Sequence, residues 1–212
     1  MARELAKRVG YVYVDSGAMY RAVTLYAMRN GMVAPDNSII TDRLVAALPG
    51  IGISFNAAGA DGVQHTLLNG EDVEREIRDM KVSSLVSPVA VIPEVRERLV
   101  ALQQEFGKQK GIVMDGRDIG TTVFPDAELK IFVCASPEER ARRRLKELQE
   151  KGVDVSYEEV YKNVVDRDRI DTTREVSPLR KADDAIELDN GTMTREEQMA
   201  WLLDRFGETT GK

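Results

Sequence analysis

Short apolar runs alternate with amphipathic helical patterns along most of this chain, and this alternation limits the possible folds more than any other feature. Runs that fit buried strands lie at Tyr11–Asp15, Ile112–Asp115, Leu129–Cys134 and Ala185–Asp189, and helical patterns follow them. Strands separated by helices pack as a parallel sheet with helices on both of its faces. The sequence therefore predicts a three-layer α/β fold.

Capping boxes mark the starts of three helices. In each box, a serine or threonine stands three residues before a glutamate, and its hydroxyl can accept the backbone N–H of that glutamate. These segments are Ser136–Glu139, Ser156–Glu159 and Thr194–Glu197. Gly31 and Gly207 predict where two helices end, namely the one that begins near Gly17 and the last one.

The region 36–111 breaks the alternation. It contains a helical pattern at Thr41–Leu48, a hairpin pattern of Ile51–Phe55 with Val63–Leu68, and two further helical patterns, the second of which begins at Pro93. Glycines within 58–62 suit the hairpin turn because glycine readily adopts positive φ. We expect a subdomain that is inserted between strands of the sheet.

Composition and charge exclude several classes of protein. The net charge of -6 over 212 residues argues against nonspecific binding to nucleic acid or to an anionic membrane. Cys134 is the single cysteine, which excludes an internal disulfide framework, and a histidine-based metal cluster would rest on His65 alone. No stretch approaches the ~20 apolar residues of a membrane span, and the N-terminus lacks the apolar core of a signal peptide. We expect a cytoplasmic protein with small-molecule ligands.

Three polar motifs are informative, and the first of them stands where α/β proteins bind their ligands. Asp115–Asp126 (DGRDIGTTVFPD) places acids, an arginine and glycines directly after an apolar strand. Ser16–Arg21 (SGAMYR) follows another strand, and Arg167–Arg174 (RDRIDTTR) ends a helix before Pro178. With these motifs the chain resembles the bacterial cytidylate kinases, from Ala2 to about Phe206.

The resemblance implies a fold, a reaction and a domain organisation. The fold is the P-loop NTPase fold of the nucleoside monophosphate (NMP) kinases, and the reaction transfers the γ-phosphoryl group of ATP, bound with Mg²⁺, to CMP or dCMP. A core of 1–35, 112–151 and 179–212 would carry an inserted NMP-binding subdomain at 36–111 and a lid at 152–178. We expect a monomer that binds nucleotides and neither nucleic acid nor membrane.

Two arginines near strand ends suit the phosphate of the acceptor nucleotide. Phosphoryl transfer needs cations around the equatorial oxygens rather than a covalent nucleophile, and a guanidinium can bind phosphate through two N–H groups. The resemblance assigns Arg21 and Arg117 to this phosphate and Ser16 to substrate binding. Simple surface arginines are the alternative, although Arg117 lies between a strand end and glycines.

Cytosine presents an amine next to two acceptors, so a specific site combines a carboxylate with a donor such as arginine. Asp118 is the candidate carboxylate, and the resemblance adds Ser87 and Arg96. An ionised Asp118 would reject uracil, which has an acceptor in place of the amine. The alternatives are a helix-end hydroxyl for Ser87 and an i,i+4 ion pair within a helix for Arg96.

The charged run at 167–174 matches the R-D-x-x-D-x-x-R pattern of the family lid. The resemblance implies that Arg167, Asp171 and Arg174 contact CMP, and that Arg21, Arg117, Arg167 and Arg174 are catalytic. Ile170 stands where the family often has another arginine. The alternative is a solvated charge run at a helix end.

A basic helix face precedes the lid and consists of Arg140, Arg142, Arg143 and Arg144. We expect Arg144 to contact the phosphates of ATP and most of the others to lie on the surface. RNA binding through this face is a rival interpretation, but no aromatic residues are interleaved with the arginines to support it.

Asp15, Asp115 and Asp189 each end a predicted strand. Carboxyl ends of parallel strands border the ligand crevice, where a carboxylate can orient water bound to Mg²⁺. We choose Asp115 as the indirect metal ligand.

The sequence lacks the phosphate-loop pattern G-x-x-x-x-G-K-[ST]. Its Gly-Lys pairs, Gly107–Lys108 and Gly211–Lys212, have no glycine five positions earlier, and the first helical pattern, Met1–Val9, has no strand before it. We expect that about twenty further residues, a central strand with this loop, precede Ala2 in a full-length protein. The alternatives are an inactive fragment that binds CMP and a binding module that never had such a loop.

Overall fold

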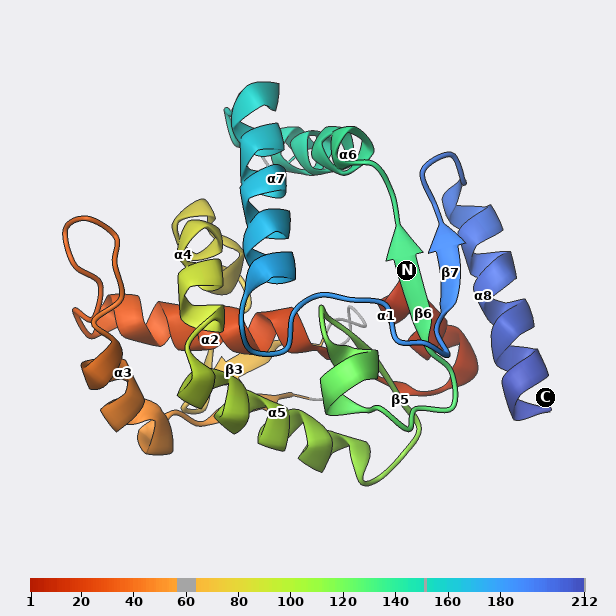
Figure 1. Ribbon diagram of the computed structural model, residues 1–212, viewed down its shortest axis with the longest axis horizontal. Helices are drawn as coiled ribbons and strands as arrows, with labels where there is room; N and C mark the ends of the chain where they lie inside the picture. Colours follow the sequence, from red (N-terminus) through yellow and green to blue (C-terminus); the bar gives the residue numbers. More distant parts are fainter. Residues whose placement is uncertain (57–63, 151, 212) are drawn as a thin grey trace. The chain divides into compact units, whose positions relative to one another are not determined.

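The computed structural model describes residues 1–56, 64–150 and 152–211 (Figure 1). The chain divides into two compact units. The first unit consists of Gly10–Gly116 with Ala2, and the second of Arg117–Lys212 with Met1 and Arg3–Val9. Helix α1 (Ala2–Val9) forms where the sequence predicts it.

The first unit contains a parallel strand pair. Strand β1 (Val12–Asp15) pairs with β5 (Ile112–Asp115), and the register sets Val12 opposite Ile112 and Asp15 opposite Asp115. Both strands lie where the apolar runs predict them. Because the strands are parallel and in register, their terminal aspartates lie next to each other at one edge.

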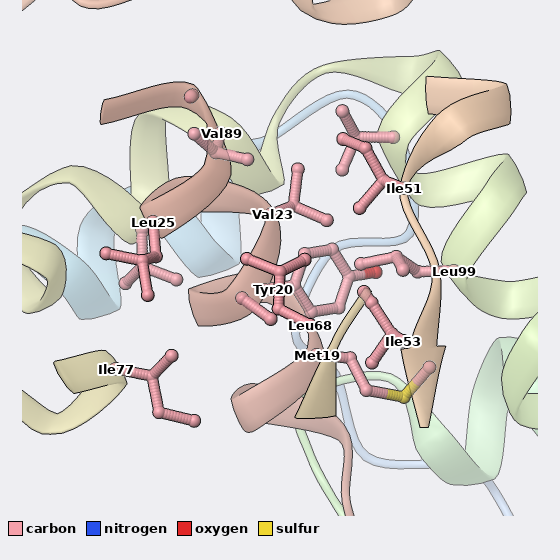
Figure 2. Close-up of a cluster of buried hydrophobic side chains, with 14 of the residues drawn as sticks. Met19, Tyr20, Val23, Leu25, Ile51, Ile53, Leu68, Ile77, Val89 and Leu99 are labelled. Atoms are coloured by element: carbon pink, nitrogen blue, oxygen red, sulfur yellow. The ribbon is translucent and has the colours of Figure 1, made fainter. Parts of the chain in front are cut away.

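Helix α2 (Ser16–Arg29) forms the centre of the first unit's core. Ala18, Met19, Ala22 and Val23 are almost completely buried, as expected for a helix that is apolar around most of its circumference. Figure 2 shows Met19 and Val23 among side chains of the surrounding elements. The helix ends before Gly31, whose φ of 62° is typical of a helix C-terminus, as predicted.

The region after α2 folds as a small antiparallel sheet with helices. Its elements are α3 (Thr41–Ala47), a 3₁₀ turn η1 (Leu48–Gly50), β2 (Ile53–Phe55), β3 (Thr66–Leu68), β4 (Glu71–Asp72), a 3₁₀ turn η2 (Glu76–Arg78), α4 (Met80–Ala90) and α5 (Pro93–Gly107). The predicted hairpin is confirmed as β2 paired with β3, while its predicted turn at 58–62 lies outside the described residues. Helix α2 packs against both α4 and β3, so this region shares the core of α2. The division into core, subdomain and lid stays a prediction.

The second unit contains another parallel pair, β6 (Ile131–Cys134) with β7 (Ile186–Asp189). Between and after these strands lie α6 (Pro137–Glu150), α7 (Tyr157–Thr173) and α8 (Arg195–Thr210), and α6 packs against α7 (Figure 1). Complete capping boxes at Ser156 and Thr194 confirm the predicted helix starts.

The predicted end of the last helix at Gly207 is wrong. Helix α8 continues to Thr210 and ends at Gly211, whose φ of 69° is left-handed. A glycine inside a helix costs only about 1 kcal/mol, so a helix that is stabilised on both sides can pass through it. The left-handed residue that ends the helix is therefore Gly211 and not Gly207.

The α/β class with parallel strands is confirmed, but the strands do not form one continuous sheet. The two parallel pairs and the β2–β3–β4 sheet are separate, and in the described ranges no strand pairs with both β5 and β6. A ladder of backbone hydrogen bonds needs neighbouring strands about 4.8 Å apart along their length. An apolar pattern alone does not specify which strands come this close. None of the helices in the described parts of the chain is long and apolar enough to cross a membrane.

Candidate active site

The carboxyl end of β1 carries four ionic side chains that contact one another: Asp15, Arg21, Glu74 and Arg78, here called the Asp15 cluster. Asp15 Oδ1 accepts the backbone N–H of Ala18 at 2.8 Å and so caps α2. Asp15 Oδ2 lies 3.0 Å from Arg21 Nη2 and 2.8 Å from Arg78 Nη2. Arg78 Nη2 also lies 2.7 Å from Glu74 Oε1. One carboxylate thus holds a helix end and two guanidinium groups.

The low exposure of the Asp15 cluster shifts the pKa values of its members. Burial raises the pKa of Asp15, but Arg21 and Arg78 outweigh burial and hold the pKa below its usual range. Burial lowers the pKa of Arg21, with Asp15 opposing the shift. The Nε of Arg21 is buried and lacks a hydrogen-bond partner in the described part of the chain. A buried donor of this kind calls for an acceptor, which a bound anion would supply.

Gly17 provides the space in which the guanidinium of Arg21 lies. A Cβ at this position would stand 3.1 Å from Arg21 Nη1 and 3.2 Å from Asp15 Oδ1. The first N–H groups of a helix carry partial positive charge and favour anions. The start of α2 therefore presents both a helix N-terminus and an arginine to an anionic ligand.

Asp115 and Ser16 meet at the same strand ends. Ser16 Oγ donates to the Asp115 carbonyl at 2.6 Å, and Tyr13 Oη donates to Asp115 Oδ1 at 3.0 Å. Asp115 is exposed as a whole residue. Partial desolvation of its carboxyl group and, next in size, the charge of Asp15 raise the pKa of Asp115. Mg²⁺ is usually held through one or two carboxylates and several waters. The neighbouring carboxylates of Asp15 and Asp115, whose repulsion raises the pKa of Asp115, fit such an ion. The described residues contain no group of three or more potential metal ligands.

Ser87 and Arg96 are both buried in the first unit. Ser87 lies on α4 and is 7% exposed, and Arg96 lies on α5 and is 2% exposed. Arg96 Nη1 donates to the Ala90 carbonyl at 3.1 Å, and its guanidinium lies over the ring of Tyr20. The alternative for Arg96, an i,i+4 ion pair within the helix, stays a prediction.

In the second unit, three arginines surround one buried aspartate. We call Arg117, Asp118, Arg167, Asp171 and Arg174 the Asp171 cluster. Arg117 Nε lies 2.9 Å and Arg167 Nε 3.7 Å from Asp171 Oδ2, and Arg174 Nη1 lies 3.4 Å from Asp171 Oδ1. Arg174 Nη2 lies 3.9 Å from Asp118 Oδ1. Side chains more than fifty positions apart in the chain therefore meet in one polar cluster.

Asp118 is positioned by the turn that follows it. Its carbonyl accepts the N–H groups of Thr122 at 2.9 Å and Val123 at 3.3 Å, at the start of a π-helical turn, η3 (Ile119–Val123). The residue is 5% exposed. A buried carboxylate beside Arg174 can accept hydrogen bonds from a ligand with high selectivity.

A family model described as cytidylate kinase matches residues 1–207. The cytidylate kinase of Parabacteroides distasonis is 58% identical over 211 residues, which cover 100% of this chain and 92% of that protein. The cytidylate kinase of Bacteroides thetaiotaomicron is 58% identical, and the match covers 98% of this chain and 90% of that protein. The cytidylate kinase of Porphyromonas gingivalis is 55% identical, and the match covers 100% of this chain and 91% of that protein. The chain belongs to the cytidylate kinase family. Membership supports the NMP kinase type of α/β fold.

The site residues that the sequence predicts for a cytidylate kinase fall into the two units. In the first unit, Ser16, Arg21 and Asp115 lie at the ends of β1 and β5, and Ser87 and Arg96 are buried on α4 and α5. In the second unit, the structure brings the remaining predicted CMP contacts together in the Asp171 cluster.

The basic face of α6 is more engaged than the sequence suggests. Arg140 donates to both carboxylate oxygens of Asp168 on α7, and Arg143 donates to the carbonyls of Asn190 and Gly191 after β7. These two arginines therefore brace α6 rather than lie free on the surface. Arg144 Nη1 lies 3.3 Å from Glu147 on its own helix, so its predicted contact with ATP stays a prediction.

Like Glu74, Arg78 is a member of the Asp15 cluster that the sequence does not reveal. Its surroundings, Glu74–Asp79, read as a solvated charge run. The only signal is the i,i+4 spacing of Glu74 and Arg78, which is common on exposed helices. The contact with Asp15 spans 63 positions and becomes visible only in the structure.

A cavity of about 270 Å³ in the second unit is lined by Lys130, Arg180 and Asp184 among others. It includes none of the Asp171 cluster. We do not assign it to nucleotide binding.

Proposed function

We propose that this chain transfers the γ-phosphoryl group of ATP to CMP or dCMP, giving CDP or dCDP. The observation that carries the proposal is the Asp171 cluster, in which three arginines and a buried carboxylate, Asp118, share a site. Arginines stabilise the charge that develops on a transferring phosphoryl group, and a buried carboxylate can recognise an amine. Membership of the cytidylate kinase family supports the same reaction.

In this proposal the base is read by Asp118 with Ser87 and Arg96. Asp118 accepts the exocyclic amine of cytosine, and Arg96 and Ser87 donate to the acceptors N3 and O2. The burial of all three side chains supports these roles, because a buried polar group that loses its partner costs about 1–3 kcal/mol. A site of this kind discriminates strongly against uracil.

The acceptor phosphate is bound by Arg21 and Arg117, with Ser16 nearby, and Arg167, Asp171 and Arg174 close over the nucleotide from the lid. Arg21, Arg117, Arg167 and Arg174 stabilise the transition state. The unpartnered Nε of Arg21 supports its role, because this donor lacks an acceptor in the described part of the chain. The ion pairs of Asp171 support a role for this residue in orienting the arginines.

The donor side rests on fewer residues. Mg²⁺ bound with ATP would neutralise phosphate charge, and Asp115 would orient its water ligands. Arg144 would contact the phosphates of ATP. In this proposal, no residue of this sequence is assigned to hold the β- and γ-phosphates of ATP as a phosphate loop does.

A coupled assay of ADP formation tests the proposal, with ATP and Mg²⁺ as donor and with CMP, dCMP, UMP or AMP as acceptor. We expect turnover with CMP and dCMP and at least tenfold lower kcat/KM with UMP and AMP. CMP binding without ADP formation would instead favour the alternative, a CMP-binding fragment or module. Gel filtration tests the expected monomer, and cell fractionation tests the cytoplasmic location.

A further inference from the structure

Arg78 is held more firmly than an ordinary charged side chain of a turn. It ends η2, whose central residue Ile77 is fully buried in the core and so anchors the turn. Its Nε and Nη2 lie 3.0 Å and 2.7 Å from Glu74 Oε1, and its Nη2 lies 2.8 Å from Asp15 Oδ2. Two carboxylates on different elements thus fix one guanidinium.

The two arginines of the Asp15 cluster are immediate neighbours. Both Nη2 atoms contact the same oxygen, Asp15 Oδ2. The positive charge of Arg78 contributes to the lowered pKa of Arg21, after burial and against the opposing effect of Asp15. Holding two like charges this close is unfavourable unless anions lie between or beside them.

Each arginine keeps part of its guanidinium for another partner. Asp15 and Glu74 occupy Nε and Nη2 of Arg78, and its Nη1 has no partner in the ranges that the structure describes. Arg21 uses Nη2 alone, which leaves its Nη1 and Nε. Phosphate is the ligand that matches several guanidinium N–H groups beside a helix N-terminus.

Building on the proposed function, we infer that Arg78 is a further phosphate-binding residue, which contacts the phosphate of CMP together with Arg21. Asp15 and Glu74 are its positioning residues. The two carboxylates offset the charge of the two arginines, so the cluster is preformed before the nucleotide arrives. A phosphate on the remaining N–H groups then interacts with two cations and the start of α2 without reorganisation of the cluster.

A purely structural brace between η2 and β1 would use the same ion pairs. The two roles differ in what they do to ligands, because a brace affects nucleoside and nucleotide alike. A phosphate ligand affects CMP and spares cytidine, which has the same base and sugar. The difference between these two ligands isolates the phosphate contact.

The test is isothermal titration calorimetry of CMP and of cytidine with the full chain and with Arg78→Gln. We expect Arg78→Gln to weaken CMP binding about 10- to 100-fold, as the loss of a charged hydrogen bond does, and to change cytidine binding less than twofold. Arg75→Gln is the matched control, since Arg75 is an exposed arginine that flanks the same turn. It should change neither affinity more than twofold.

Equal weakening of CMP and cytidine, or no change in either, would overturn the role of Arg78. If Arg78→Gln does not fold, Arg78→Lys replaces it, with an expected CMP loss of about threefold to tenfold and unchanged cytidine binding; equal losses again overturn the role. Failure of the unchanged chain to bind CMP at all would refute the proposed function itself. Normal CMP binding that is unaffected by Arg78→Gln would refute this inference alone.

Discussion

The Asp15 cluster and the Asp171 cluster use the same residue types in different ways. In the Asp15 cluster, two arginines face two carboxylates, and the ion pairs measure 2.7–3.0 Å. In the Asp171 cluster, three arginines face two aspartates, and the ion pairs described above measure 2.9 Å for Arg117 and 3.4–3.9 Å for Arg167 and Arg174. The first cluster is balanced in charge and tightly bonded, whereas the second has an excess of positive charge and longer contacts. The comparison indicates that carboxylates hold the arginines of the first cluster in place, whereas the second cluster leaves positive charge that an anionic ligand can balance.

The largest expected effect tests the positive excess of the Asp171 cluster. Arg117→Ala should lower kcat about 10²- to 10³-fold, because it removes a cation from the transferring phosphoryl group. Steady-state kinetics measure the loss. Arg169→Ala, which removes an exposed arginine of the same unit, should leave kcat within twofold. A loss below threefold for Arg117→Ala would contradict the assignment.

The next effect tests the tight bonding of the Asp15 cluster. Asp15→Asn should lower the free energy of unfolding at pH 7 by about 2 kcal/mol, because it leaves two close arginines without the charge between them. The pKa of Asp15 is lowered in the folded protein, so its stabilisation is complete above the unfolded pKa of about 3.9 and is lost as the pH falls through the folded pKa.

Urea denaturation of both proteins at pH 7 and at pH 3 checks this prediction. The difference in unfolding free energy should shrink at pH 3, because this pH lies below the unfolded pKa of about 3.9 and Asp15 is then mostly protonated in the unfolded chain of the unchanged protein. Asp42→Asn, at an exposed position of the same unit, serves as the control for the loss of one acidic charge. An equal difference at the two pH values would show that the charge of Asp15 is not what stabilises the cluster.

A smaller effect tests what the buried carboxylate of the Asp171 cluster recognises. Asp118→Asn should lower the ratio of kcat/KM for CMP over UMP about tenfold, because the amide can donate to uracil O4 as well as accept from the cytosine amine. Asp126→Asn, at an exposed position of the same unit, should leave the ratio unchanged. An unchanged ratio for Asp118→Asn would show that Asp118 does not read the base.

The smallest effect concerns Asp115, beside the Asp15 cluster. Its raised pKa means that ionised Asp115 destabilises the folded protein above the folded pKa, and that this destabilisation disappears as the pH falls below the unfolded pKa. Asp115→Asn should therefore raise the Tm slightly at pH 7. Solvent screening limits the gain in unfolding free energy to on the order of 0.5 kcal/mol. Its turnover should at the same time need more Mg²⁺. Thermal melting and a Mg²⁺ titration of the assay measure both, and a lower Tm would contradict the sign.

Much of the fold follows from local patterns. The apolar run at Ile112–Asp115 and the capping boxes at Ser156 and Thr194 place a strand and two helices correctly. Local patterns do not specify which strands pair, since pairing depends on contacts between distant residues, and the expected single sheet is found as separate pairs. Strand β4 is two acidic residues long and carries no strand pattern.

The candidate site follows the same division. Arg117, Asp118 and Asp171 stand in recognisable motifs, and the structure places them in one cluster. Arg78 lies in no recognisable motif. Its contact with Asp15 depends on the packing of η2 against the core, which the sequence does not show. Sequence patterns thus identify residues that a family shares in fixed spacing and miss those whose role depends on tertiary contact.

Gly17 sets a limit on how this protein can be engineered. The residue lies inside α2, and its φ is not in the left-handed region, so the backbone alone does not need glycine there. A designer who ranks substitutions by helix propensity would choose Gly17→Ala early, for a gain of up to about 1 kcal/mol. The new methyl group would stand 3.1 Å from Arg21 Nη1, so the guanidinium would have to shift by a few tenths of an ångström. If Arg21 binds phosphate as proposed, a variant selected at this position for thermal stability alone would bind phosphate more weakly.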